Sequence, residues 1–163
     1  MKRLQLTLFV PESISGMIES VRRVVDPVQH RLIPAHVTLC REDELETFAG
    51  WRERLESLKP GEIALCLRFG RAEPSSGHGL LLPCIEGIDR FRKLRRSILG
   101  SDAIRDSQPH LTLAHPRNPK SASNSIELTL QLPETFEIEF PAIRLIEQVD
   151  SSPWRTIEVF PSP

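Results

Sequence analysis

The chain has 163 residues, a length that suits one domain with a hydrophobic core and is short for two independent ones. Its residues are 39% hydrophobic and 26% charged, a composition that excludes a disordered chain. The 21 Lys and Arg residues against 22 Asp and Glu residues leave a net charge of −1, without the basic excess of proteins that grip long nucleic acid. We therefore expect a monomeric single domain over residues 1–163 that does not bind long duplexes.

The cysteines and the apolar runs indicate the compartment. Three cysteines, Cys40, Cys66 and Cys84, form an odd set without metal-ligand spacing, which is typical of free thiols in a reducing compartment. The first residues enter an alternating pattern directly, and no apolar run is long enough to cross a bilayer. We expect a cytoplasmic protein without a signal peptide and without a membrane partner.

The first third of the chain predicts a strand, a helix, a second strand and a second helix. In residues 4–10 apolar residues occupy the even positions and Gln5 and Thr7 the odd ones, which predicts a strand that ends at Pro11. Ser13 is the candidate N-cap of an amphipathic helix that Pro27 ends. A strand over residues 35–40 and a charged helix over residues 42–58 follow.

The rest of the chain predicts further strands around one more helix. Residues 63–69 and 79–84 read as a hairpin, residues 88–99 as an amphipathic helix ended by Gly100, and a strand follows Pro109. Residues 116–125 indicate a surface loop or short helix, and residues 135–140, 143–149 and 154–160 indicate strands. Strand, helix and strand thus recur in both halves, a weak internal repeat. We predict an α+β fold with two pseudo-symmetric lobes, each an antiparallel sheet with flanking helices, around a central cleft.

A short motif occurs twice, as His36-Val37-Thr38-Leu39 and as His110-Leu111-Thr112-Leu113. Side chains alternate between the faces of a strand, so each histidine shares a face with its threonine while the apolar residues take the other. Two such strands facing one cleft would form a two-histidine active site. The alternative is that each histidine only hydrogen-bonds within its sheet, as single histidines often do; the duplication favours the active site.

Two imidazoles can supply both proton transfers that phosphodiester chemistry needs. Histidine acts as a base or an acid near neutral pH, so one neutral and one protonated ring beside a phosphorus need no metal. Thr38 and Thr112 are placed to donate hydrogen bonds to the nonbridging oxygens as charge builds on them. The residues do not decide which histidine is the base. No His-Glu-x-x-His or paired Cys-x-x-Cys spacing exists, so we expect no metal site.

The two motifs resemble the paired His-x-Thr-x signature of the 2H phosphoesterases, the superfamily that contains the 2′-5′ RNA ligase-like proteins and the cyclic phosphodiesterases. The resemblance implies that His36, His110, Thr38 and Thr112 are the catalytic residues and that no cofactor is needed. It also implies a small phosphodiester or an RNA end as the substrate. The reaction we expect opens a 2′,3′-cyclic phosphate to a 2′-phosphate, as a step of RNA processing.

Three alternatives to this function stay open. One is a 2′-5′ RNA ligase, which runs the same chemistry in reverse, and another is a 2′-5′ oligonucleotide phosphodiesterase. The third is a noncatalytic module that holds an RNA end or a nucleotide in the same cleft. A cysteine nucleophile is also conceivable, because Cys40 has the same strand parity as His36 and Thr38, although free cysteines are usually buried and inert.

Three residues outside the motifs are candidates for substrate binding. Arg117 follows the second motif in a loop and could reach a phosphate, although a solvated loop arginine is as common. Trp154, with Arg155 beside it, begins the last predicted strand and could stack on a base, although tryptophan more often packs in a core. By alternation His115 points away from the site, unless the strand has already ended at Ala114.

Overall fold

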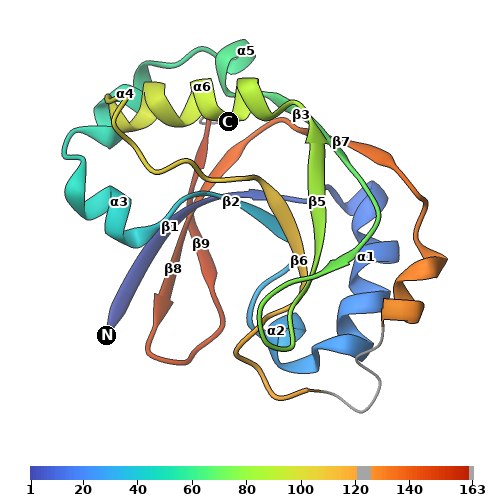
Figure 1. Ribbon diagram of the computed structural model, residues 1–163. Coiled ribbons are helices and arrows are strands. Elements are labelled where there is room, and N and C mark those ends of the chain that lie inside the picture. The colour runs from blue at the N-terminus through green and yellow to red at the C-terminus, as the bar shows by residue number, and fades with distance from the viewer. Residues whose placement is uncertain (121–125, 162–163) are drawn as a thin grey trace.

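The computed structural model describes residues 1–120 and 126–161, and its strands form two antiparallel sheets (Figure 1). The first sheet has the order β2-β1-β8-β9, with β1 at Lys2–Phe9, β2 at His36–Cys40, β8 at Ile143–Val149 and β9 at Arg155–Phe160. The second has the order β4-β5-β3-β7, with β6 also paired to β5; the bounds are β3 Leu65–Phe69, β4 Glu73–Pro74, β5 Leu80–Glu86, β6 His110–Ala114 and β7 Phe136–Phe140. The predicted α+β fold with two lobes of antiparallel sheet is confirmed.

The helices cover the sheets and reach the strands that carry the motifs. They are α1 Glu12–Val25, α2 Pro27–Leu32, α3 Glu42–Thr47, α4 Trp51–Ser57, α5 Pro60–Ile63, α6 Ile88–Leu99 and the 3-10 helix η1 Ile126–Gln131. Helix α1 packs against β6, and helix α6 packs against α4, β2 and β3 (Figure 1). Each of the two longest helices therefore supports a motif strand. Within the described part of the chain, no helix has the length and apolar character to cross a membrane.

Each motif strand lies at an edge of its own sheet, and the two edges meet. Strand β2 pairs with β1, strand β6 pairs with β5, and β2 and β6 lie against each other. The apolar residues of both motifs, Val37, Leu39, Leu111 and Leu113, are fully buried. This burial anchors both strands by their apolar faces and leaves the histidines and threonines on the opposite faces.

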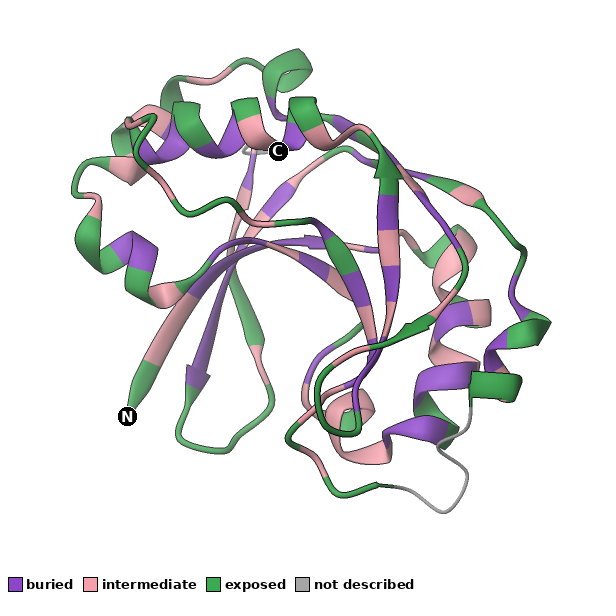
Figure 2. Ribbon diagram, in the orientation of Figure 1, coloured by how far each residue is buried: buried purple, intermediate pink, exposed green. Residues whose placement is uncertain are grey.

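One hydrophobic core extends through both sheets. Figure 2 shows buried residues alternating along the strands and along the inner faces of α1 and α6. The core cluster includes Leu6 and Leu8 of the first sheet and Leu67, Phe69 and Ile138 of the second. Because these residues belong to one contiguous cluster, each sheet helps to hold the other in place.

Two helix boundaries differ from the sequence prediction. The helix predicted over residues 42–58 is two helices, because Phe48 leaves the helical conformation and Gly50 adopts a φ of 78°, which glycine alone accepts without strain. Ser13 is not an N-cap, since α1 begins at Glu12 directly after Pro11. Pro27 ends α1 but also begins α2, because a proline in the first helical turn needs no N–H partner.

The second half of the chain also departs from prediction at its element ends. Strands β3 and β5 pair as the predicted hairpin, but β4 lies between them in the chain. The predicted strand start at Ile63 is instead the end of α5, which Pro60 begins. Of the loop predicted over residues 116–125, residues 121–125 lie outside the described residues.

Candidate active site

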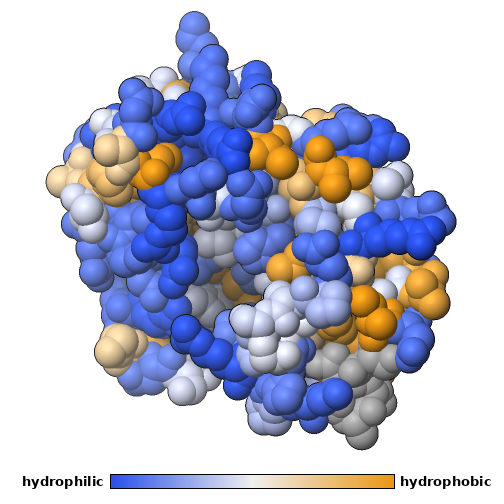
Figure 3. Space-filling model, in the orientation of Figure 1, coloured by the Kyte–Doolittle hydropathy of each residue, from blue (hydrophilic) through white to orange (hydrophobic). Residues whose placement is uncertain are grey.

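A cavity of about 570 Å³ lies where the two motif strands meet. His36, Thr38, His110 and Thr112 all line it. Figure 3 shows the surface hollowed near the centre of this view, with hydrophilic residues predominating around the hollow. The structure thus brings the two histidine–threonine pairs together at one polar cavity, although they are distant in sequence.

The two histidines are oriented in the same way by the backbone. Nδ1 of His36 lies 2.7 Å from the carbonyl oxygen of Pro34, and Nδ1 of His110 lies 2.9 Å from that of Gln108. A carbonyl oxygen only accepts hydrogen bonds, so each Nδ1 carries a proton and donates it. In each ring Nε2 is therefore the atom left to take or deliver a proton.

An ion pair between the buried Arg22 and the half-buried Glu19 fixes the backbone that orients His36. The Arg22 guanidinium donates to Glu19 and to the carbonyl oxygen of Ile33, at 2.9 Å in both cases. Glu19 in turn accepts a hydrogen bond from the backbone N–H of Ala35. These contacts hold both neighbours of Pro34, so the carbonyl group that binds the His36 ring has little freedom to move.

The surroundings of His36 favour its neutral form. Burial lowers the pKa of His36 to about 4; the hydrogen bond to Pro34 opposes this shift, while the positive charges of Arg22 and His110 add to it. The ring also meets Phe9 edge-on, with 6.3 Å between the ring centres. At neutral pH His36 therefore presents an unprotonated Nε2 to the cavity, as a general base must.

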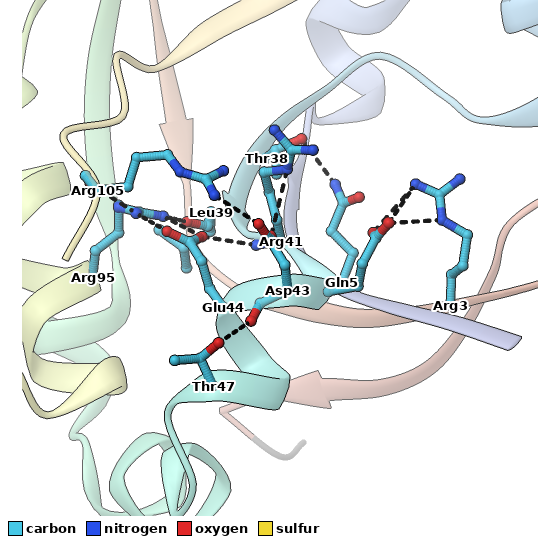
Figure 4. Close-up of polar contacts among 11 residues, drawn as sticks. Arg3, Gln5, Thr38, Leu39, Arg41, Asp43, Glu44, Thr47, Arg95 and Arg105 are labelled. Carbon is cyan, nitrogen blue, oxygen red and sulfur yellow. Dashed lines mark hydrogen bonds and ion pairs between the residues drawn. The ribbon is translucent and has the colours of Figure 1, made fainter.

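Strand β1 contributes residues that the sequence analysis missed. The Nε2 atom of Gln5 lies 2.8 Å from Oγ1 of Thr38 (Figure 4). The same nitrogen lies 3.1 Å from Oγ1 of Thr7. Arg3 also lines the cavity, where it donates to Glu42. The signal that could have found Gln5 and Arg3 is the row of polar residues at odd positions of the first strand, opposite its buried leucines.

His115 lines the cavity, because β6 ends at Ala114 and the alternation stops there. The buried carboxylate of Asp26 accepts from the backbone N–H of His115 at 2.8 Å and from the Asn118 side chain at 2.9 Å. The backbone N–H of Arg117 donates to Nδ1 of His115 at 3.2 Å. Burial lowers the pKa of His115, so its neutral ring carries the proton on Nε2, the reverse of His36 and His110.

The other candidate residues separate into two groups. Arg117 and Trp154 line the cavity, whereas Arg155 lies outside its lining on β9, where its Nε donates to Glu147 at 3.1 Å. Cys40 is fully buried outside the cavity lining, and burial raises the pKa of its thiol to about 12. A cysteine nucleophile at Cys40 is therefore ruled out as a neutral-pH thiolate.

All three cysteines are free thiols. Among residues 1–120 and 126–161, no three His, Cys, Asp or Glu side chains are grouped so that they could hold a metal ion. The donors at the cavity are instead imidazoles, hydroxyl groups, amides and guanidinium groups. Such groups bind and protonate anions.

Several solved structures share this architecture. E. coli LigT complexed with phosphate matches with a TM-score of 0.60 and 14% identity, over 98% of this chain and 96% of that chain. E. coli LigT complexed with 3′-AMP matches with a TM-score of 0.57 and 13% identity, over the same shares. A crystal structure of a protein described as a phosphoesterase matches with a TM-score of 0.58 and 14% identity, over 98% of each chain. No curated protein sequence matches the chain.

A family model provides the evidence of relationship that these low identities do not. The model of the 2′-5′ RNA ligase superfamily matches residues 10–151, a range that contains both motifs, the whole second sheet and strands β2 and β8 of the first. The resemblance drawn from the duplicated motif is thereby confirmed. The chain belongs to the 2′-5′ RNA ligase superfamily, the 2H phosphoesterases.

Proposed function

We propose that the chain hydrolyses 2′,3′-cyclic phosphates of RNA ends or nucleotides to 2′-phosphates, with His36 as the general base and His110 as the general acid. The observation that carries this proposal is the matched orientation of the two imidazoles in one cavity, each bound through Nδ1 and each with Nε2 available. Membership in a superfamily of phosphoesterases and RNA ligases supports it.

The two histidines would move one proton each. Nε2 of His36 takes a proton from water as the water oxygen bonds to phosphorus, and the bond from phosphorus to O3′ breaks. Nε2 of His110 gives its proton to O3′, which leaves the phosphate on O2′. Exchange with solvent then returns His36 to its neutral form and His110 to its protonated form. Both proton transfers are thus assigned to residues of this chain.

Other residues of the cavity would bind the phosphate and the base. Thr38 and Thr112 would donate hydrogen bonds to nonbridging oxygens, and the Nε2–H group of His115 would act as a third donor. Arg117 would add positive charge, and Trp154 would offer a face for a base to stack on. A cavity of about 570 Å³ has the size of a small-molecule site, which suits a nucleotide or a strand end.

A panel of phosphodiesters tests the proposal. The panel contains nucleoside 2′,3′-cyclic phosphates, a 2′-5′-linked dinucleotide and ADP-ribose cyclic phosphate, each with and without EDTA, with products identified by ³¹P NMR. We expect the nucleoside cyclic phosphates to become 2′-phosphates at a rate that EDTA leaves unchanged. Binding without turnover would indicate the noncatalytic module instead, and preferred turnover of the dinucleotide would indicate a 2′-5′ phosphodiesterase.

A further inference from the structure

We propose that Gln5 is a positioning residue, which turns the hydroxyl proton of Thr38 into the cavity and so places the subsite for an anionic phosphoryl oxygen beside Thr38. The inference deepens the function proposed above and rests on it. It concerns a residue of β1 that carries no part of either motif.

The position of the Gln5 amide is fixed from two sides. Gln5 is 8% exposed, and its amide nitrogen lies 2.8 Å from Oγ1 of Thr38 (Figure 4). It also lies 3.1 Å from Oγ1 of Thr7. Thr7 is fully buried within β1, and Thr38 lies on the neighbouring strand β2. An amide nitrogen has two N–H groups, so both are used by these two hydroxyl oxygens.

This contact decides what the Thr38 hydroxyl can do. Because Oγ1 of Thr38 accepts a hydrogen bond from Gln5, its single proton points elsewhere, and Thr38 lines the cavity. A hydroxyl group held in this way is a donor before any substrate arrives. Such preorganised donors stabilise negative charge that builds on an oxygen in the transition state.

The two motifs are unequal in this respect. Within residues 1–120 and 126–161, no protein group donates to the hydroxyl of Thr112, which also lines the cavity. The hydroxyl of Thr112 therefore has no fixed orientation, whereas the hydrogen bond from Gln5 directs the hydroxyl proton of Thr38 away from Gln5 and leaves it available to donate. The phosphoryl oxygen beside Thr38 is accordingly the one where the structure best accommodates negative charge.

A reversed amide would have the opposite effect. With its oxygen toward the two hydroxyl groups, Gln5 would accept the Thr38 proton and turn it away from the cavity. A carboxylate at position 5 would do the same, because it only accepts. Gln5→Glu also places a negative charge beside the phosphate, so it lowers activity in either orientation. The neutral variant Gln5→Met separates the two orientations, because it lowers kcat if the amide donates and does not lower kcat if the amide accepts.

The experiment compares Gln5→Glu and Gln5→Met with the wild type on adenosine 2′,3′-cyclic phosphate. We expect kcat to fall about 100-fold or more in Gln5→Glu, the loss typical of removing one oxyanion donor. In Gln5→Met we expect a loss of about tenfold or less, since a neutral hydrogen bond is removed without adding a charge. Gln131→Glu is the control and keeps the wild-type kinetics, because Gln131 is an exposed residue of helix η1 outside the cavity lining.

Two readouts separate positioning from a structural role. In Gln5→Glu the ratio of variant to wild-type kcat should rise as the pH is lowered, because a protonated carboxyl group donates again to Thr38. In addition, Gln5→Met should not lower kcat further in a protein that already carries Thr38→Val. In a protein that carries Thr112→Val, the fold-losses in kcat of the two substitutions should multiply. Equal coupling to both threonines would overturn the inference.

The affinity for inorganic phosphate tests the role of Gln5 independently of the proposed reaction. If the wild type turns over no phosphodiester, the proposed function fails, and phosphate affinity measured by NMR titration then tests Gln5 alone. We expect Gln5→Glu to weaken phosphate binding by about tenfold or more, as loss of a hydrogen bond to a charged group does. Wild-type phosphate affinity in Gln5→Glu, or no phosphate binding by the wild type, would overturn the inference.

Discussion

At the scale of single residues, His36 and His110 share a motif but not their surroundings. His36 is half-buried against Phe9 and near the positive charge of Arg22, whereas His110 is exposed. Burial disfavours the charged form of an imidazole, so the more buried ring, that of His36, is the neutral one. This difference is why we assign the base to the first motif and the acid to the second.

The lowered pKa of His36 also predicts how stability depends on pH. Between about pH 4 and 6.5 the unfolded chain binds a proton at His36 that the folded chain does not, so stability falls as the pH drops through this window. Because the ring is partly exposed, we expect a contribution of about 1–2 kcal/mol between pH 7 and pH 5. Urea unfolding at both values should show a drop smaller by this amount in His36→Gln. An equal drop in both proteins would contradict the assignment.

The sequence predicted the roles of the motif residues better than it predicted which other residues contact them in the fold. Strand alternation was enough to place His36 and Thr38 together, because it is a local property of the backbone. Gln5 and His115 depend on long-range features: the pairing of β1 with β2 and the residue at which β6 ends. The polar odd positions of β1 mark Gln5 as a candidate, but only the pairing of β1 with β2 shows that it lies beside Thr38.

At the scale of elements, a buried ion pair joins both motif strands to the helices. Arg95 of α6 donates to Glu44 of α3 at 2.6 Å, to the carbonyl oxygen of Leu39 in β2, and to that of Arg105 in the segment that leads to β6 (Figure 4). Burial would raise the pKa of Glu44, but hydrogen bonds from Arg95 and from the backbone of Arg41 outweigh it and hold the pKa lower. The carboxylate is thus kept charged where Arg95 needs it.

We expect the variant Arg95→Met to lose about 3–5 kcal/mol of unfolding free energy, because Glu44 is left as a buried charge without its partner. Arg96→Met is the matched control on the same helix, since Arg96 is exposed and lies 3.7 Å from the exposed Asp102. We expect that control to change stability by about 0.5 kcal/mol or less. Urea unfolding measures both, and equal effects of the two substitutions would contradict the role given to Arg95.

The junction of α1 and α2 is linked to the loop after β6 through Asp26. Its carboxylate caps α2 by accepting from the backbone N–H of Gln29 at 2.9 Å and also holds His115 and Asn118. In Asp26→Asn we expect KM for a cyclic phosphate to rise about tenfold with kcat little changed, because a charge-assisted contact to a binding loop is lost. Asp102→Asn, outside the cavity lining, serves as the control. A fall in kcat at constant KM would contradict this assignment.

Element types were more predictable than element ends. The periodic patterns of α1, α6 and the motif strands were sufficient to predict them, because burial of one face dictates the pattern. The break between α3 and α4 was missed, because the apolar residues keep a helical spacing across it, although Phe48 leaves the helical conformation and Gly50 adopts a φ of 78°. Helix η1 was also missed, because it is a 3-10 helix and lacks the 3.6-residue period by which α-helices are predicted.

At the scale of the whole molecule, the cavity lies at the junction of the two sheets, and the core behind it is continuous. Antiparallel sheets were predicted from strand runs without a βαβ signature, which is a property of the whole sequence. The order of the strands was not predictable, since β8 lies between β1 and β9 through pairing of opposite ends of the chain. Such pairing depends on packing rather than on any local pattern.

The continuous core leads us to propose that residues 1–163 form one cooperative domain. Trp51 and Trp154 report on different regions of the molecule, α4 and the start of β9. We expect their fluorescence and the far-UV circular dichroism to follow one common urea transition, as a two-state domain requires. Two separate transitions, or a Trp signal that leads the loss of secondary structure, would show that the lobes unfold independently.

The central claim is that two imidazoles act on one phosphorus, and a double-mutant cycle on adenosine 2′,3′-cyclic phosphate tests it most directly. His36→Ala and His110→Ala should each lower kcat by about 10²–10⁴-fold in a folded protein, the usual contribution of a general acid or base. The double variant should be little slower than either single one, because the two proton transfers belong to one step. Wild-type turnover by either single variant, or losses that multiply fully in the double variant, would contradict the claim.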